Sequence, residues 1–444
     1  MTKAPVGLQE LRRRIYRKAK SDKTHRFWGL FVHVAKIETL EEAYRIAKGN
    51  GGAAGVDGQK FEAIESAGRL AFLAAVREDL ITGKYKPMPN RPVEIPKGNG
   101  KFRTLQIPCI RDRVVQGALK LILEAVFEAD FCPNSYGFRP KRSPHQALAQ
   151  VRRSVMRRMS RAIDVDLSRY FETIRHSVLL DKIAKRIQDP QVMRLVRQII
   201  KVGGQVGVPQ GGPFSPLAAN IYLNEIDWFF DAIRRQTAEG GYEAINYHRF
   251  ADDVVITVSG HHTKRGWAER ALQRLQEQFA LIGVELNREK TRVVDTLRGE
   301  AFGFLGFDLR RVRKRKGDGY FILMTPKKKA RTSVKAKIRD IVGHGGATPM
   351  PELVKKINAT LGGWVNYFRV GNSSRAFSEV RDYVEMKIRT LLTRRKRRRK
   401  SSVGWRRWSN EYLYDVLGLY WDWKIQPLPG AESFVKAAVV QQDP

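Results

Sequence analysis

The spacing of apolar residues predicts that much of the chain is helical. Over residues 112–129 the apolar side chains recur every three or four positions and therefore share one face of a helix. The same spacing predicts further helices over residues 37–47, 70–81, 178–187, 191–200, 267–282, 351–362 and 376–393. Ser143, Pro144 and Gln146 carry the start signal of another helix, with an N-cap oxygen, an early proline and a glutamine that can complete a capping box.

Other stretches alternate apolar and polar residues, as strands do. Residues 91–107 predict two short strands around Gly98, Asn99 and Gly100, and residues 248–258 predict a strand pair around Ala251. The strands and helices follow one another without a regular βαβ repeat, so the pattern indicates an α+β fold.

The last part of the chain differs from the rest. Past Leu309 the sequence becomes dense in Lys and Arg, and residues 343–348 have the composition of a linker. We therefore expect a basic, helical domain to follow the mixed one.

The whole chain carries a large positive charge. It has 82 Lys and Arg against 45 Asp and Glu, which gives a formal net charge of +37 over 444 residues. This excess favours a polyanionic partner, most commonly nucleic acid, and a membrane surface is the weaker alternative. Residues 1–26 are strongly basic with few large apolar side chains, so we expect an arm that becomes ordered on its ligand.

Only two cysteines occur, Cys109 and Cys132, which excludes a disulfide framework and a Cys-rich zinc site. The chain also has no apolar run of about 18 residues and no signal-peptide pattern. We therefore expect a soluble protein of a reducing compartment.

Two adjacent carboxylates, Asp252 and Asp253, stand beside an apolar run that is typical of a buried strand. Because desolvating an ion costs about several kcal/mol, such groups must shift their pKa, find cationic partners or hold metal. Nucleotidyl transfer offers a role, since two Mg²⁺ ions about 3.5–4 Å apart activate the primer hydroxyl and are held by carboxylates. Asp164 and Asp166 could supply further carboxylates, although aspartate is also common in tight turns.

A third stretch has the composition of a ligand-binding turn. Residues 207–227 read GVPQGGPFSPLAANIYLNEID, in which Gln210 and two glycines precede Ser215, Pro216 and a long apolar helix. Glycine lets the backbone approach a ligand closely, and an ordinary helix start would not require Gln-Gly-Gly before its cap.

Nine motifs occur in a fixed order between about residues 30 and 425: GAAGVDG, IPKGNGKFRTLQIP, SYGFRPKRSPHQAL, DVDLSRYF, PQGGPFSPLAANIYLNEID, RFADDVVI, LNREKT, FLGF and GWVNYFR. With this set the chain resembles a bacterial group II intron-encoded reverse transcriptase and maturase. The resemblance implies a right-hand polymerase of the α+β class, with fingers, palm and a helical thumb that is the maturase X domain. It places the basic N-terminal extension and fingers in residues 1–160, the palm with a finger segment in 161–312, the thumb in 313–400 and a short DNA-binding-like region in 401–444.

The resemblance also assigns the polymerase site. Asp166 would be the first palm aspartate, because it lies five positions before the aromatic that screens the sugar, here Phe171. The other aspartate of DVDL is then a bystander. Asp252 and Asp253 match the paired aspartates, so these three residues are the expected catalytic groups and the ligands of two Mg²⁺ ions.

Two positions depart from the family pattern. Phe250 stands where tyrosine is usual, and because the ring is kept while the hydroxyl is lost, we expect activity to survive with altered fidelity. Glu172 follows the aromatic where aspartate is common, and no role is assigned to it.

The nucleotide pocket follows from the same resemblance. Lys97 and Arg103 would bind the incoming triphosphate, since an ammonium and a forked guanidinium suit phosphate oxygens. The alternative for these two is a solvated loop. Gln210 and Phe171 would line the nucleotide and template pocket, and Lys290 would protonate the leaving pyrophosphate as a general acid.

The stretch LGGWVNYFR, residues 361–369, resembles the maturase region that grips intron RNA. Its aromatic residues have the spacing of a buried helix face, so we expect them in the core. RNA contact is expected instead on basic residues: Arg369, Lys387, Arg389, Arg394, Arg395, Lys396, Arg397, Arg398, Arg399 and Lys400. For the run 394–400 a solvated basic surface and a nuclear-targeting segment stay open as alternatives.

Residues 425–444 hold no Cys or His, so we expect a protein of the endonuclease-lacking type, which must find an existing primer or nick. The cluster from Trp405 to Trp423 interleaves aromatic and basic residues and is expected to be a shortened DNA-binding region.

The function that these observations predict is an RNA-directed DNA polymerase that binds its group II intron RNA, assists splicing and copies the intron during retromobility. Its partners would be intron RNA, an RNA template with a DNA primer, target DNA and deoxynucleoside triphosphates, without a membrane. We expect it in the bacterial cytoplasm, and at the nucleoid when it is bound to DNA. Two alternatives stay open: an RNA-binding splicing chaperone, and a domesticated reverse transcriptase in host defence or repair.

Overall fold

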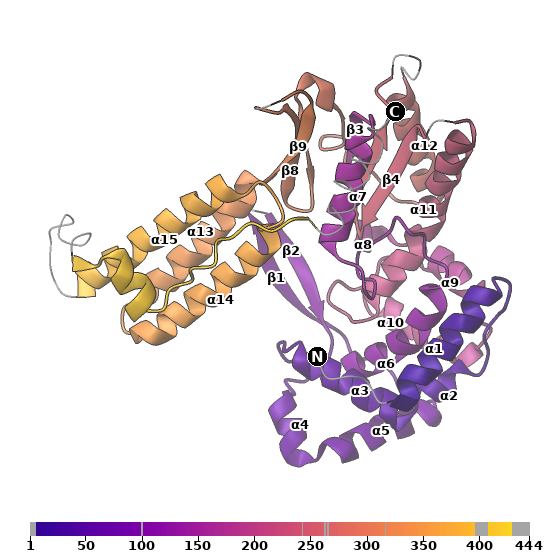
Figure 1. The fold of residues 1–444 in the computed structure, drawn as a ribbon. Helices are drawn as coiled ribbons and strands as arrows, with labels where there is room; N and C mark the ends of the chain where they lie inside the picture. The colour runs from indigo at the N-terminus through magenta and orange to yellow at the C-terminus, as the bar shows by residue number, and fades with distance from the viewer. Residues whose placement is uncertain are drawn as a thin grey trace. The chain divides into compact units, whose positions relative to one another are not determined.

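The structure is a computed structural model that describes residues 6–98, 101–241, 243–261, 263, 266–315, 317–395 and 407–428 (Figure 1). Helices and strands are mixed along the chain, in agreement with the expected class. The chain forms two compact units. Unit 1 contains the residues up to Arg142, Val165–Val254 and Glu269–Thr291, and unit 2 contains Ser143–Asp164, Val255–Ala268 and the residues from Arg292 onwards.

Unit 1 has a helical part around α6 (Ile110–Phe127), which is buried on nearly every side because apolar residues occupy most of its circumference. Three of the helices that precede α6 pack against it, and so does α11 (Ser215–Glu239). The helices that precede α6 are α1 (Val6–Ser21), α2 (Leu30–Val34), α3 (Ile37–Gly49), α4 (Phe61–Ala67) and α5 (Arg69–Ile81). The predictions of helices over 37–47, 70–81 and 112–129 are confirmed within two residues at each end.

The N-terminal segment differs from the expected arm. Residues Val6–Ser21 form α1, which packs against α6. Leu8, Ile15 and Ala19 are buried, and Arg12 pairs with Glu124 of α6 at 2.7 Å. The expectation of an arm that orders only on its ligand was wrong, because a narrow apolar stripe at helical spacing gives this basic segment a partner within unit 1.

Unit 1 also contains the first predicted hairpin, β1 (Arg91–Gly98) with β2 (Lys101–Ile107), which pair antiparallel as expected. The remaining helices of this unit are α8 (Tyr170–Thr173), α9 (His176–Ala184), α10 (Pro190–Lys201), α11 (Ser215–Glu239) and α12 (Trp267–Leu281). Helix α11 packs against α9 and against the strand that leads to Asp252.

A four-stranded sheet has the strand order β4-β5-β3-β6. Its strands are β3 (Arg161–Asp166), β4 (Ile245–Phe250), β5 (Asp253–Val258) and β6 (Arg292–Asp295). Strands β3 and β6 run antiparallel, with Arg161 opposite Asp295. A carboxylate therefore stands at the end of β3 and another at the start of its neighbour β5.

Unit 2 begins with α7 (Pro144–Met156), where the predicted capping box is present between Ser143 and Gln146. A three-stranded antiparallel sheet in the order β7-β8-β9 follows later in the chain. The other elements of this unit are the 3-10 turn η2 (Thr296–Arg298), β7 (Ala301–Phe304), β8 (Phe307–Arg313), β9 (Tyr320–Pro326), α13 (Lys328–Gly343), α14 (Met350–Phe368), α15 (Ser374–Arg395) and the π-helical turn η3 (Tyr412–Val416).

Helix α13 packs against both α14 and α15, which places the three helices side by side (Figure 1). Their shared core includes Val334, Ile338, Ile357 and Ile388. Helix α13 and strand β9 were not predicted. The apolar positions of α13 are sparse among Lys and Arg, whereas β9 is a short apolar run inside a stretch that was described only by its basic composition. No helix in the described part of the chain is both long enough and apolar enough to cross a membrane.

Candidate functional site

Asp252 and Asp253 lie where β4 turns into β5. The turn consists of Ala251 and Asp252, since β4 ends at Phe250 and β5 begins at Asp253. Asp252 is exposed and Asp253 is half-buried, whereas the next three residues of β5 are fully buried. The chain reaches the surface at this turn, and the apolar run that follows is buried only after the two carboxylates, which reconciles the charges with that run.

Asp166, the last residue of β3, pairs with a residue 124 positions further along the chain. Lys290 Nζ donates to Asp166 Oδ2 at 3.0 Å. The backbone fixes the same segment, because the Asn287 N–H donates to the Asp166 carbonyl at 2.8 Å. The side chains are 44% exposed at Asp166 and 61% at Lys290, so water screens the pair and it contributes little to stability. Two predicted site residues are thus brought together.

Besides burial, the charge of Asp252 contributes to the pKa of Tyr170, which lies four residues after Asp166. Burial raises the pKa of Tyr170 well above its ordinary value, and the charge of Asp252 adds to the increase. Within the described residues, no group of three or more His, Cys, Asp or Glu side chains is arranged to hold a metal ion. The convergence of Asp166, Asp252 and Asp253 on shared metal ions therefore stays a prediction.

The β1–β2 hairpin carries the two predicted triphosphate ligands. Ile95 of β1 lies opposite Arg103 of β2, and the Arg103 side chain is exposed. The side chain of Lys97 and residues 99–100 of the tip lie outside the part of the chain that is described. Because the Arg103 guanidinium is exposed near the hairpin tip, it is accessible to a phosphate oxygen.

The glycine-rich turn contacts the base of this hairpin. The Gln106 N–H donates to the Gln210 carbonyl at 2.7 Å. At Gly211, which has φ +123°, a Cβ atom would stand 2.8 Å from the Gln106 carbonyl oxygen. Glycine is required there by the close approach of the two segments as well as by the backbone angle.

Phe171 lies in the short helix α8 and is half-buried. Its carbonyl accepts the N–H of Val208 at 2.8 Å. Only Pro209 separates Val208 from Gln210, so this hydrogen bond joins Phe171 to the segment that carries the predicted nucleotide-pocket glutamine.

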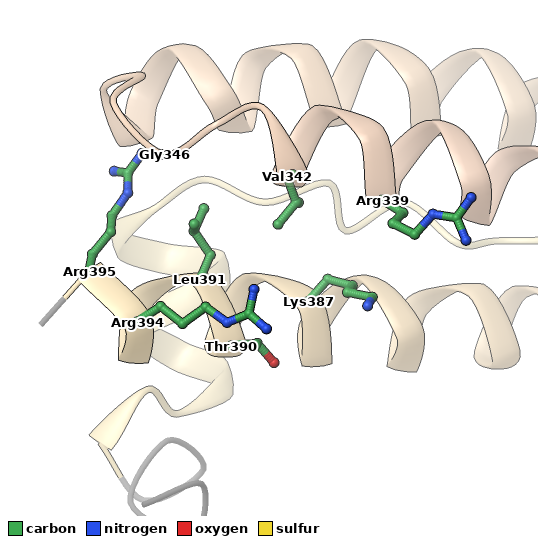
Figure 2. A pocket seen from close by; sticks show the side chains of 9 residues that line it. Arg339, Val342, Gly346, Lys387, Thr390, Leu391, Arg394 and Arg395 are labelled. Atoms are coloured by element: carbon green, nitrogen blue, oxygen red, sulfur yellow. The ribbon is translucent and has the colours of Figure 1, made fainter. Parts of the chain in front are cut away.

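A basic pocket of about 390 Å³ opens between α13 and α15 in unit 2. Figure 2 shows Arg339 on α13 facing Lys387 and Arg394 on α15. Val342 and Leu391 supply apolar surface, and no carboxylate is among the described residues that line the pocket. We call this cavity the α13–α15 pocket. Its charge favours a polyanion.

Arg395 borders the α13–α15 pocket but is engaged within the protein. Its guanidinium donates to the carbonyls of Gly345, at 2.5 Å, and Thr348. These bonds fix the connection between α13 and α14 (Figure 2). The predicted contacts Lys396, Arg397, Arg398, Arg399 and Lys400 lie outside the described residues.

Two other predicted RNA contacts are buried. Arg369 is 8% exposed and pairs with Asp422 at 2.7 Å. Arg389 is 3% exposed and donates to the Trp408 carbonyl at 2.8 Å and to Glu385 at 3.1 Å. These groups are held by acceptors inside unit 2, so the expectation that they face RNA is corrected.

The aromatic residues after the basic run divide between two environments. Trp408 is 7% exposed and belongs to the core that α13, α14 and α15 share, whereas Trp421 is 70% exposed. Trp405 lies outside the described residues. Within unit 2 the predicted DNA-binding cluster thus supplies core packing as well as exposed surface. Phe368, predicted to be in the core, is 5% exposed.

Residues 95–309 match the family described as reverse transcriptase (RNA-dependent DNA polymerase), and residues 331–413 match the group II intron, maturase-specific domain. Protein YkfC of Escherichia coli (strain K12) is 34% identical over 363 residues, which cover 73% of this chain and 94% of YkfC. The chain belongs to the group II intron reverse transcriptase/maturase family.

More distant relatives share part of their length with the chain. Group II intron-encoded protein LtrA of Lactococcus lactis subsp. cremoris is 28% identical over 323 residues, which are 56% of this chain and 53% of LtrA. The putative COX1/OXI3 intron 2 protein of Saccharomyces cerevisiae is 26% identical over 297 residues, 54% of this chain and 34% of that protein. The chain therefore spans about half the length of LtrA.

The two matches divide the functional residues of this reverse transcriptase/maturase. The reverse transcriptase match contains the three aspartates, Lys290 and most of the β1–β2 hairpin. The maturase match begins in α13, ends in η3 and contains the residues that line the α13–α15 pocket. The protein thus has an RNA-directed DNA polymerase domain, of a class that typically uses divalent metal ions, and a maturase domain.

Sequence patterns did not single out Arg249, the residue before Phe250. Its side chain is fully buried and pairs with Asp227 of α11. A signal was present, because a basic residue interrupts an otherwise strand-like stretch directly before the aspartate pair. Burying such a charge requires a partner from elsewhere in the chain.

Proposed function

We propose that this protein binds its own group II intron RNA, assists the splicing of that RNA and copies it into DNA during retromobility. The proposal assigns fingers to residues 1–160, palm to 161–312, thumb to 313–400 and a DNA-binding-like end to 401–444, in a right-hand arrangement. It locates the protein in the bacterial cytoplasm, and at the nucleoid when target DNA is bound.

The observation that carries the polymerase part is the contact between Asp166 and Lys290. The Lys290 ammonium lies 3.0 Å from the Asp166 carboxylate. This carboxylate therefore already attracts a cation, which supports Asp166 as a metal ligand. The exposed Asp252 and the half-buried Asp253 offer oxygen donors of the kind that Mg²⁺ prefers. We assign these three residues as the ligands of two Mg²⁺ ions.

When bound, the two ions would favour the deprotonated primer hydroxyl and stabilise negative charge on the phosphate. The protein side chains have separate tasks. Arg103 and Lys97 bind triphosphate oxygens, and the ring of Phe171 screens the sugar beside Gln210. Lys290 holds a proton at Nζ that is available to the leaving pyrophosphate.

The polymerase assignment is tested by primer extension on RNA with Mg²⁺. Asp252→Asn is expected to reduce the rate by at least about a hundred-fold, because a neutral amide is a poor ligand for a hard cation. Asp164→Asn is the matched control and should stay near wild type, since Asp164 accepts the Gly303 N–H at 3.2 Å in a structural role. Undiminished synthesis by Asp252→Asn would contradict the assignment.

The basic surface of unit 2 supports a second candidate function, that of a splicing chaperone which needs no polymerisation. The α13–α15 pocket presents Arg339, Lys387 and Arg394 with no carboxylate among its described lining residues. If the variant with asparagine at all three site aspartates promotes splicing as well as wild type, splicing assistance depends on the binding surface alone. A group II intron RNA flanking the reading frame would identify the ligand.

A further inference from the structure

Arg249, next to last in β4, forms a forked ion pair in the core of unit 1. Its Nε lies 2.7 Å from Asp227 Oδ1, its Nη2 lies 2.5 Å from Asp227 Oδ2, and both side chains are 0% exposed. Burial disfavours the charged guanidinium, but the charge of Asp227 outweighs this and raises the pKa of Arg249 above its ordinary value. The Arg249 guanidinium therefore stays charged.

The same guanidinium reaches the turn that carries the two aspartates. Its Nη1 donates to the Ala251 carbonyl at 3.0 Å and to Asn220 Oδ1 at 2.9 Å. Asn220, also on α11, donates through Nδ2 to the Gly137 carbonyl at 2.8 Å. One side chain thus connects helix α11 to the turn.

Ala251 is a position that needs this support. Its φ is +58°, a left-handed conformation that residues other than glycine adopt at a cost. Such a conformation persists only where the surrounding structure holds it. Gly137 packs against the turn so closely that a Cβ there would overlap the Ala251 backbone nitrogen.

The backbone of Arg249 is fixed as well. Its N–H donates to the Asn134 carbonyl at 3.0 Å, and its carbonyl accepts the Tyr136 N–H at 2.9 Å. The main chain of Arg249 thus fixes the end of β4, and its side chain fixes the turn that follows.

We propose that Arg249 is a positioning residue for polymerisation: anchored on α11 by Asp227 and Asn220, it holds the Ala251 carbonyl and so sets where Asp252 and Asp253 stand. The proposal rests on the proposed role of these aspartates. Arginine is required because a planar fork offers donors in several fixed directions, whereas a lysine ammonium is a single point on a flexible stem.

The test compares Arg249→Lys with Arg186→Lys. Arg186 is a matched control in unit 1, since it is also buried, pairs with Asp130 at 2.9 Å and donates to the Ala19 carbonyl at 2.8 Å. For Arg249→Lys we expect kcat of primer extension to fall roughly ten- to a hundred-fold with KM for the nucleotide nearly unchanged. Hydrogen exchange of the amides in residues 248–254 should become faster. Arg186→Lys should change neither.

A second variant separates positioning from folding. Arg249→Met combined with Asp227→Leu removes both buried charges, and replacing a whole buried pair by apolar residues commonly preserves stability. If the double variant has the wild-type melting temperature but a low kcat, the proposal is supported. This holds even if Arg249→Lys alone does not fold. A wild-type kcat in this double variant overturns it.

Asp252→Asn is included to separate the two claims. If it polymerises like wild type, the proposed role of the aspartates fails, whatever Arg249 does. If it is inactive while Arg249→Lys retains the wild-type kcat and hydrogen exchange, only the positioning role fails.

Discussion

Two arginines, one from each unit, have opposite environments. Arg249 is fully buried in unit 1, where Asp227, Asn220 and the Ala251 carbonyl accept its hydrogen bonds. Arg394 is exposed at the α13–α15 pocket of unit 2, whose described lining contains no carboxylate. The positive charge of this protein therefore has two components, one that holds the fold and one that remains available to phosphate.

The largest expected effect comes from Arg389, a buried arginine in the basic unit. Arg389→Met removes the closest cation from the buried Glu385 carboxylate, which keeps only the Tyr414 hydroxyl at 2.6 Å and Arg381 at 3.9 Å. We therefore expect the free energy of unfolding to fall by about 3 kcal/mol. Urea unfolding measures this, with the exposed Arg394→Met as a control that should change the free energy by less than about 0.5 kcal/mol. If Arg389→Met kept wild-type stability but weakened RNA binding, Arg389 would belong with the pocket residues.

Gly137→Ala should damage the aspartate turn without removing any charge. The added Cβ would overlap the Ala251 nitrogen, and displacing reactive groups by about 1 Å is enough to reduce a rate by about a hundred-fold. Single-turnover primer extension measures the loss, and RNA affinity should not change. Gly49→Ala is the control, because nothing lies within 4 Å of a Cβ at Gly49. A Gly137→Ala enzyme with full activity would mean that the turn adapts easily.

Neutralising the α13–α15 pocket should weaken RNA binding but leave short-template polymerisation intact. For Arg339→Gln, Lys387→Gln and Arg394→Gln together, we expect a loss of affinity of roughly ten-fold and a salt dependence that is weaker by about 2–3 units of slope. Filter binding across a salt series measures both. Control variants replace three exposed lysines elsewhere by glutamine: Lys20, Lys36 and Lys60. If the control variants lost as much RNA affinity as the pocket variants, the effect would come from total charge and not from the pocket.

The smallest expected effect is on acid stability. Burial lowers the pKa of His248 on β4 to about 3, so the unfolded chain binds a proton below about pH 6.5 that the folded chain does not. The contribution of His248 to the free energy of unfolding is therefore complete above pH 6.5 and is lost progressively as the pH falls towards 3. Between pH 7 and 5.5 we expect a loss of about 1 kcal/mol, measured by urea unfolding. His248→Gln should remove this part of the pH dependence.

The local signals in the sequence predicted local structure well. The capping box at Ser143, the hairpin at residues 91–107 and the turn at Ala251 are present as expected. Each depends on contacts between residues a few positions apart, which the sequence displays directly. Helix α13 was missed because its buried residues, such as Val334 and Ile338, form a narrow stripe among many cations.

The candidate site was predictable only in part. The resemblance named Asp166 and Lys290 from separate motifs, and the structure brings them within 3.0 Å. It did not indicate that Arg369 and Arg389 are buried, because a basic residue in a basic segment looks the same whether it faces water or a carboxylate. It also gave no role to Arg249, whose partner Asp227 lies on another element.

The net charge, the main helices and hairpins, and the place of two carboxylates at the start of a buried strand all follow from the residues and their order. These properties depend on residue identity and on neighbours a few positions away. Only the tertiary structure decided which arginines hold the fold and which line an open pocket. Burial and ion pairing depend on residues that are distant in the chain, and the cost of desolvating a charge is set by the partner that it meets there.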